Sequence, residues 1–178
     1  MKNIILTLLG IFLFTTSCTS QTYVESGVVN SLVQQEQFTF MAESVNITNQ
    51  DVMNAINSLP GGSSARMQQL SYGYDIVFEN KEMTVNLPYF GRTYNSSRMQ
   101  DNGGFNFTSR DYSLSKKEGK KGQIILTVKP NDIKTINAIY IEISPKGKAF
   151  VSINSNDRQP ISFSGYIMKN EIKKEKSE

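Results

Sequence analysis

Few residues of this sequence have types and spacing that could carry out catalysis. The chain contains no histidine and one cysteine, Cys18. The lack of histidine excludes the Ser-His-Asp arrangement and most zinc sites, and one cysteine excludes an internal disulfide or a cysteine cluster. The carboxylates Asp75, Glu79 and Glu82 fall near one predicted hairpin, but Asp75 and Glu79 are expected to point outward from a strand, away from any cavity. We therefore predict a protein that is not an enzyme and uses no metal or cofactor.

Cys18 follows a segment that is typical of export signals. Lys2 supplies a positive charge, residues 4–14 carry no charge, and small residues precede the cysteine. The apolar run is shorter than the about 20 residues that a membrane-spanning helix needs, so we expect residues 1–17 to be a signal peptide that is removed. The segment resembles the lipobox of bacterial lipoproteins, in which the cysteine is acylated and becomes the new N-terminus, although Thr15 stands where the lipobox usually has leucine.

Acylation of Cys18 would also account for the cysteine count. An unpaired thiol in an exported protein invites disulfides between molecules, unless the sulfur is modified. We therefore expect the membrane as a partner through a lipid anchor, on the periplasmic side of the cell envelope. The alternative is cleavage near Ser17 or Ser20 without acylation. A net charge of only +3 and the lack of basic-aromatic strand motifs predict no nucleic-acid partner.

After the leader, apolar and polar residues mostly alternate with period two, the pattern of half-buried strands. We predict about eight strands, at residues 38–42, 70–78, 83–87, 105–114, 123–129, 139–143, 149–153 and 161–168. Hairpin turns are expected at residues 80–81 and 144–147. A short helix is expected around residues 24–32, and a second one from a cap at Thr48 to a stop at residues 60–62.

This pattern predicts an all-β fold, an antiparallel meander that forms a lipocalin-like barrel or sandwich with one or two short N-terminal helices. We expect a lipidated tether at residues 18–25, a single β domain at 26–168 and a charged, frayed tail at 169–178. A barrel spanning the outer membrane would need longer strands with an apolar outer band. The predicted outward positions carry Thr, Ser, Asn, Glu and Lys instead.

Two groups of residues are candidates for binding. Tyr72 and Tyr74 would line a chamber if their strand faced inward, because an eight-stranded barrel can hold a small ligand; alternatively, the rings fill the interior. Tyr89, Phe90 and Arg92 begin a loop after a strand, and such clusters are common in binding sites, but they could equally plug one end of the barrel. For the separate Arg158 there are also two interpretations: it could offer its guanidinium to a carboxylate or phosphate, or form part of a turn. Lysines at 116–121 form either a solvated turn or a surface that attracts anionic head groups.

Three segments carry a resemblance to a known family. They are Leu-Pro-Tyr-Phe-Gly-Arg at residues 87–92, Asp-Asn-Gly-Gly at 101–104, and Asn-Asp-Arg-Gln-Pro-Ile-Ser-Phe-Ser-Gly at 156–165. In this order they resemble domain of unknown function 4251, over roughly residues 26–168. The resemblance implies a small exported protein or lipoprotein of a Bacteroidota-type envelope, with a short N-terminal helix followed by an antiparallel β domain. It implies no activity.

The preferred hypothesis is therefore an envelope lipoprotein whose β domain binds a small apolar or glycan-like ligand. The alternative is a structural or interaction protein that docks another envelope protein through the loop at residues 89–104.

Overall fold

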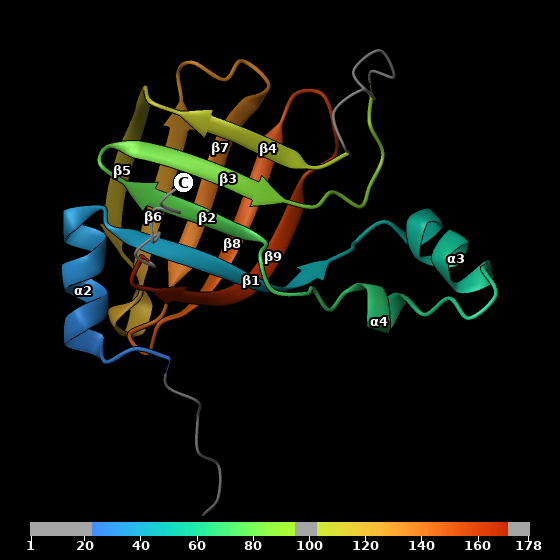
Figure 1. Ribbon diagram of the computed structural model, residues 1–178, viewed down its shortest axis with the longest axis horizontal. Coiled ribbons are helices and arrows are strands. Elements are labelled where there is room, and N and C mark those ends of the chain that lie inside the picture. Colours follow the sequence, from blue (N-terminus) through green and yellow to red (C-terminus); the bar gives the residue numbers. More distant parts are fainter. Residues whose placement is uncertain (1–22, 95–102, 171–178) are drawn as a thin grey trace, which may run out of the picture.

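The computed structural model describes residues 23–94 and 103–170, and within them nine antiparallel strands form one sheet that curls into a nearly closed barrel (Figure 1). The order across the sheet is β4-β3-β2-β1-β9-β8-β7-β6-β5. The strands are β1 (Phe38–Asn46), β2 (Asp75–Glu79), β3 (Glu82–Leu87), β4 (Phe105–Ser109), β5 (Tyr112–Glu118), β6 (Ile124–Pro130), β7 (Ile136–Ile143), β8 (Lys148–Ser155) and β9 (Ile161–Met168). The predicted all-β class is confirmed. The predictions for residues 1–22, including Cys18, for the middle of the 89–104 loop (95–102) and for the tail beyond residue 170 lie outside the described residues.

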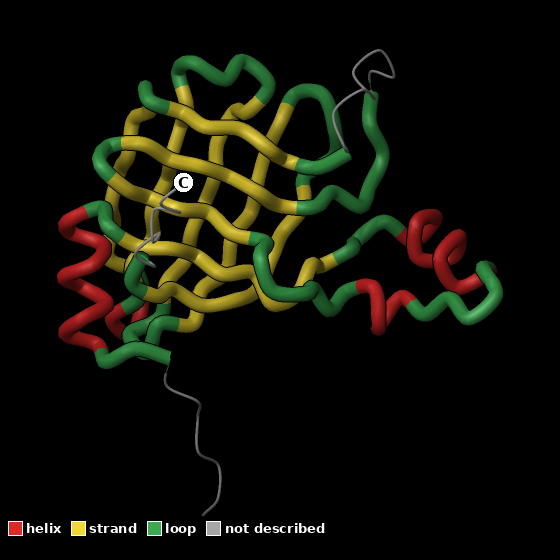
Figure 2. The backbone as a smooth tube through the Cα atoms, viewed as in Figure 1, coloured by secondary structure: helices red, strands yellow, loops and turns green. Residues whose placement is uncertain are grey.

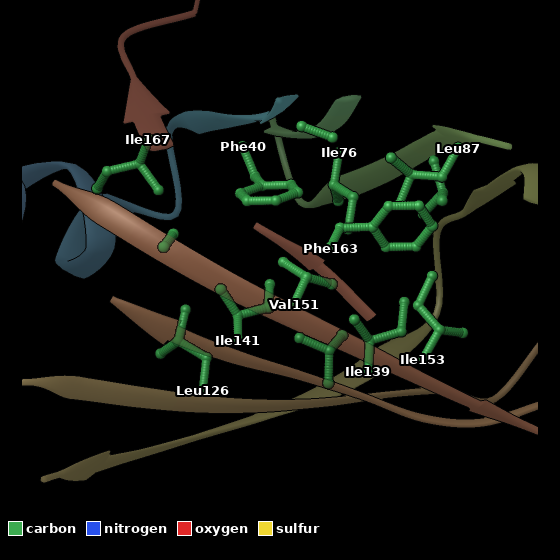
Figure 3. Packing of buried hydrophobic residues seen from close by; sticks show 14 of the residues in the cluster. Phe40, Ile76, Leu87, Leu126, Ile139, Ile141, Val151, Ile153, Phe163 and Ile167 are labelled. Carbon is green, nitrogen blue, oxygen red and sulfur yellow. The ribbon is translucent and has the colours of Figure 1, made fainter. Parts of the chain in front are cut away.

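The sheet folds over so that β1–β4 cross in front of the other strands (Figure 2). Apolar side chains from both layers form one core cluster. The interior is filled with large side chains, as Figure 3 shows for one part of it. Those that are essentially inaccessible include Phe38, Phe40, Phe78, Phe163, Ile76, Met83, Leu87, Leu126, Ile139, Ile141, Ile143 and Ile153. Each such side chain contributes about 1.5–3 kcal/mol on burial. These side chains fill the interior of the barrel, where a chamber for a ligand was one of the two predicted arrangements.

The prediction that Tyr72 points into the barrel is wrong, because β2 begins only at Asp75. Gly73 has a φ of +107°, which breaks the extended chain, and its carbonyl accepts a hydrogen bond of 2.7 Å from the Asn86 amide. Tyr72 is 69% exposed. Tyr74 is half-buried and packs against the core cluster, so it contributes to packing and does not line a chamber.

The predicted strand at 105–114 is two strands, β4 and β5, which are the opposite edges of the sheet. The chain breaks at Arg110, where the carboxylate of Asp132 accepts hydrogen bonds from the Ser109 hydroxyl at 2.6 Å and from the Arg110 and Asp111 amides at 2.9 and 3.3 Å. Asp132 thereby fixes the corner where the two edges approach each other.

Helices lie beside the barrel. The first predicted helix is α2 (Ser26–Gln35), whose residues Val29, Leu32 and Val33 belong to the core. The second is α3 (Gln50–Ser58), followed by the short α4 (Ser64–Met67). Both project away from the barrel in Figure 1, and Ile56 is the one buried residue of α3. Asn49, not the predicted Thr48, caps α3. None of the helices in the described ranges has the length and apolar character to span a bilayer.

Small residues allow the strands to curve where the layers come together. Gly165 of β9 lies between Ala42 of β1 and Ala149 of β8 in the sheet. A Cβ at Gly165 would overlap the carbonyl oxygen of Met41. The β1–β9 pairing also shifts register between Ala42 and Ser44, and such a bulge bends a strand.

We expect Gly165→Ala to lower the free energy of unfolding by about 1–3 kcal/mol, the usual cost of overpacking a core. Gly27→Ala is the control, because a Cβ at Gly27 has open space on α2 and alanine favours a helix. Urea unfolding measures both free energies. Equal stability of the two variants would mean that the close approach at Gly165 is unimportant.

The Asp132 corner predicts a dependence of stability on pH. Hydrogen bonds from Ser109 and from the Arg110 amide hold the pKa of Asp132 below its ordinary value of 3.8. A lowered pKa in the folded state means that the carboxylate stabilises the fold above pH 3.8 and that this contribution is lost as the pH falls through the folded-state pKa. We expect the stability difference between the wild type and Asp132→Asn in urea unfolding to shrink between pH 7 and pH 3. A constant difference would show that the charge is not involved.

Candidate functional site

The fold brings together Tyr89, Arg92 and Arg158, three of the residues singled out in the sequence. They meet where β3 ends, β4 begins and the turn between β8 and β9 passes. Thr93 forms a bridge with Arg158, and the Gln159 amide donates a hydrogen bond of 3.1 Å to the Arg92 carbonyl. Segments that are more than 60 positions apart in the sequence therefore form one local structure.

Arg158 is held by groups of the chain itself. Its guanidinium carbon lies 5.1 Å from the centre of the Tyr89 ring and 4.9 Å from that of Phe105. The guanidinium donates hydrogen bonds to the Asp157 carboxylate at 3.0 and 3.3 Å and to the Gly104 carbonyl at 3.2 Å. The side chains of Arg158 and Asp157 are only 16% and 11% exposed. We call this group the Arg158 clamp.

The electrostatics of the clamp fit a structural role. Burial raises the pKa of Asp157, but the hydrogen bond and the charge of Arg158 outweigh burial and leave that pKa below its ordinary value. A buried ion pair of this kind is costly to break from one side, because the remaining charge is left unpaired. In this geometry the Arg158 guanidinium joins the β8–β9 turn to the chain around β4, as the turn interpretation expected.

Tyr89 closes the same corner. Its hydroxyl lies within hydrogen-bond distance of two carbonyls, 2.8 Å from that of Arg92 and 3.2 Å from that of Gln159, and burial raises its pKa. Its ring meets Phe105 edge to face at a centroid distance of 5.6 Å. A Cβ at Gly91 would lie 2.5 Å from the Tyr89 hydroxyl, so a larger residue would displace the ring. Phe90 is partly buried against the core, in agreement with a plug at the end of the barrel.

Beside the clamp, two large side chains are exposed at the surface. The Arg92 side chain is 68% exposed, and its guanidinium lies 3.9 Å from the carboxylate of Asp51 at the start of α3. Tyr94 is 62% exposed, while its amide donates a hydrogen bond of 2.7 Å to the Asp157 carbonyl. We call Arg92 and Tyr94 the platform, since a backbone fixed by the clamp carries both.

A second candidate is a cleft of about 510 Å³ on the outer face of β1–β3, which we call the Tyr72 cleft. Its floor contains the apolar side chains Met41, Val77 and Met168, and Tyr72 stands at its wall. The remaining lining residues are polar or acidic, namely Thr39, Asp75, Glu79, Asn80, Glu82, Thr84, Asn86 and Asn170. Clefts of about 300–1,000 Å³ with a few polar groups over an apolar surface are typical of small-molecule sites.

Hydrogen bonds hold the borders of this cleft in place. Asn86 fixes the Tyr72–Gly73 turn through the Gly73 carbonyl. On the opposite border, the Asn170 amide donates to the Phe78 carbonyl at 2.9 Å and its oxygen accepts from the Thr39 hydroxyl at 3.0 Å. Glu82 is paired with Arg110 at 2.6 Å. The cleft therefore has a defined shape.

The alternation over residues 70–78 predicts a single strand, and so it does not predict the Tyr72 cleft, which forms because β2 begins only at Asp75. A signal was present: Met41 and Met168 are apolar residues at outward positions, and Gly73 interrupts the alternation. Two further pockets lie along α2, of about 500 and 310 Å³. All three pockets lie on the outside of the barrel, and the two along α2 each touch one core residue, Leu32 and Ile124 respectively. The described residues include no group of three metal-binding side chains.

Comparisons with known proteins agree with this fold. The model of the family named domain of unknown function (DUF4251) matches residues 21–167. A crystal structure of a DUF4251 family protein from Bacteroides eggerthii is similar with a TM-score of 0.51 and 17% identity, over 83% of this chain and 89% of that one. No curated protein matches the chain significantly. The family match covers β1–β8 and β9 as far as Ile167, including the Arg158 clamp and most of the Tyr72 cleft, and the protein therefore belongs to the DUF4251 family.

Proposed function

We propose that the protein is a non-enzymatic binding protein of the bacterial cell envelope, anchored through an acylated Cys18, that holds a glycan-like ligand in the Tyr72 cleft. The observation that carries this proposal is the contrast between the two faces of β1–β3. Their inner face is filled by Phe38, Phe40 and Phe78, whereas their outer face forms a cleft of about 510 Å³ beside an exposed tyrosine.

The lining of the cleft suits a sugar. The C–H face of a sugar ring can pack on an aromatic ring such as Tyr72 and on an apolar floor, while the hydroxyl groups donate to carboxylates and pair with amides. Asp75, Glu79 and Glu82 line the cleft, and among the residues that the structure describes no lysine or arginine does so. Like charges repel, so a neutral saccharide or an amino sugar fits this site better than an acidic one.

The anchor is supported by the sequence. The apolar run before Cys18 resembles a lipobox, and the chain has no other cysteine with which Cys18 could pair. The several acyl chains of a lipoprotein give a durable anchor, because each buried methylene contributes about 0.8 kcal/mol. The β domain would then lie on the periplasmic side of the envelope.

We expect Tyr72→Ala to weaken the binding of a neutral or amino-sugar oligosaccharide about fivefold to tenfold, which corresponds to the loss of one aromatic contact. Isothermal titration calorimetry against a panel of such oligosaccharides measures the affinity. Tyr140→Ala is the matched control, because Tyr140 is also an exposed tyrosine, at 42%, and lies on β7 outside the cleft. If no saccharide of the panel binds, or if both variants bind like the wild type, the glycan site is refuted.

A second function is favoured by the platform. Arg92 and Tyr94 are exposed on a segment whose backbone is fixed by the Arg158 clamp. A pre-organised surface loses little conformational entropy on binding, and arginine and tyrosine are enriched at protein interfaces. The platform is therefore suited to docking another envelope protein.

We expect the double variant Arg92→Ala/Tyr94→Ala to lose its crosslinked envelope partners, while its thermal midpoint stays within about 2 °C of the wild type, as for most surface changes. Arg158→Lys tests the clamp that positions the platform and leaves Arg92 and Tyr94 in place. Lysine cannot reproduce the paired hydrogen bonds and the ring contacts of Arg158, so the thermal midpoint of this variant should fall by about 5 °C. Crosslinking with mass spectrometry and calorimetry give the two readouts. An unchanged set of partners in the double variant would exclude the platform.

A further inference from the structure

Six exposed lysines lie at one end of the barrel, which we call the basic end. They are Lys116 and Lys117 in β5, Lys120 and Lys121 in the short helix η2 (Lys120–Gly122), and Lys146 and Lys148 around the β7–β8 turn. The register brings these segments together, because Ile124 of β6 pairs with both Glu118 of β5 and Ile143 of β7. A Cβ on Gly122 would lie 3.4 Å from the Pro145 side chain, so η2 approaches the β7–β8 turn.

Positive charge is in excess at this end. The carboxylates near these segments are Glu118, Glu142 of β7, Glu43 beside Tyr23 and Glu25 at the cap of α2, against the six lysines. Lysines near an anionic lipid surface each add about a fivefold preference for it, and the effects accumulate within a Debye length. The basic end thus has the charge that a surface of anionic head groups would attract.

The N-terminal part of the chain enters the barrel at this same end. The Tyr23 amide donates a hydrogen bond of 3.1 Å to the Lys146 carbonyl. The Tyr23 ring stacks on Tyr166 with a centroid distance of 4.6 Å and an interplanar angle of 8°, and its hydroxyl lies 3.3 Å from the Glu43 carboxylate. Tyr23 is therefore fixed to the β domain.

The distance from Tyr23 to the proposed anchor is short. Residues 19–22 are the only ones between Cys18 and Tyr23, and a fully extended chain of this length spans at most about 18 Å. An acylated Cys18 would thus keep the β7–β8 turn within this distance of the lipid surface, less than the diameter of a small domain. In Figure 1 the blue start of the described chain is at the lower edge of the barrel, and the turn between β8 and β9 is at the upper right.

We propose that the basic end is a membrane-facing surface that rests on anionic lipid head groups and sets the orientation of the barrel. The inference builds on the lipid anchor of the proposed function. The short tether holds the basic end near the bilayer. The lysines make this end bind anionic head groups more strongly than the sides of the barrel do. The Arg158 clamp and the platform then point away from the membrane, because the β8–β9 turn lies at the opposite ends of those strands.

The test uses the acylated protein in lipid nanodiscs that contain phosphatidylglycerol and a gadolinium-labelled lipid. Paramagnetic broadening of amide NMR signals reports which residues are close to the lipid surface. We expect at least threefold stronger broadening at Gly122 and Gly147 than at Ser109 and Ser155. Lys120→Gln/Lys146→Gln should reduce this contrast severalfold, as should 0.5 M salt. The matched control is Lys129→Gln/Lys134→Gln, which removes two exposed lysines at the other end of β6 and should retain the contrast.

The outcomes separate the orientation from the anchor. Mass spectrometry of the same sample shows whether Cys18 carries acyl chains. Acyl chains together with even broadening over the barrel would overturn the membrane-facing surface and leave the anchor intact. Equal effects of the two double variants would overturn the role of the lysines. An unmodified Cys18 would refute the anchor, and the orientation that depends on it.

Discussion

The barrel depends on the close approach of β1 and β9 at Gly165. The Met41 carbonyl occupies the space that a side chain at this position would need, and the neighbouring residues across the sheet, Ala42 and Ala149, are also small. This row of small residues lets three strands curve tightly, so that side chains such as Phe40 and Phe163 from different layers pack inside. Because protein interiors pack as densely as organic crystals, a barrel filled in this way leaves the outer surface and the ends for recognition.

The aromatic and arginine residues of the family motifs close one end of the barrel. A guanidinium between two rings loses its water, so it needs a partner of opposite charge and full hydrogen bonding, and Asp157 and the Gly104 carbonyl supply these to Arg158. The residues that look most like a ligand site in the sequence are thus mainly structural. In the proposed docking function their role would be indirect, because they determine where Arg92 and Tyr94 are exposed.

The alternation of apolar and polar residues was sufficient to predict most strands and both hairpins, since it reports which face of a strand is buried. The alternation gave a wrong prediction where contacts with distant residues override the local pattern. Residues 70–74 alternate like a strand, but Gly73 turns the chain and Asn86 fixes the turn. The break at Arg110 depends on Asp132, more than 20 positions away. The Tyr72 cleft needs side chains from β1, β2, β3 and the end of β9, a combination that no single segment of sequence reveals.

The two proposals are geometrically compatible because the Tyr72 cleft opens on the side of the barrel. Met41 of its floor pairs directly with Tyr166, the residue on which Tyr23 stacks. Neighbouring strands are about 4.8 Å apart, so the cleft begins one strand away from the point where the tether joins the domain. None of the cleft's lining residues belongs to β5, η2 or the β7–β8 turn, which form the basic end. A ligand in the cleft would then be held beside the membrane surface without occupying the basic end. The platform, at the far end, would face partners that reach it from the opposite direction.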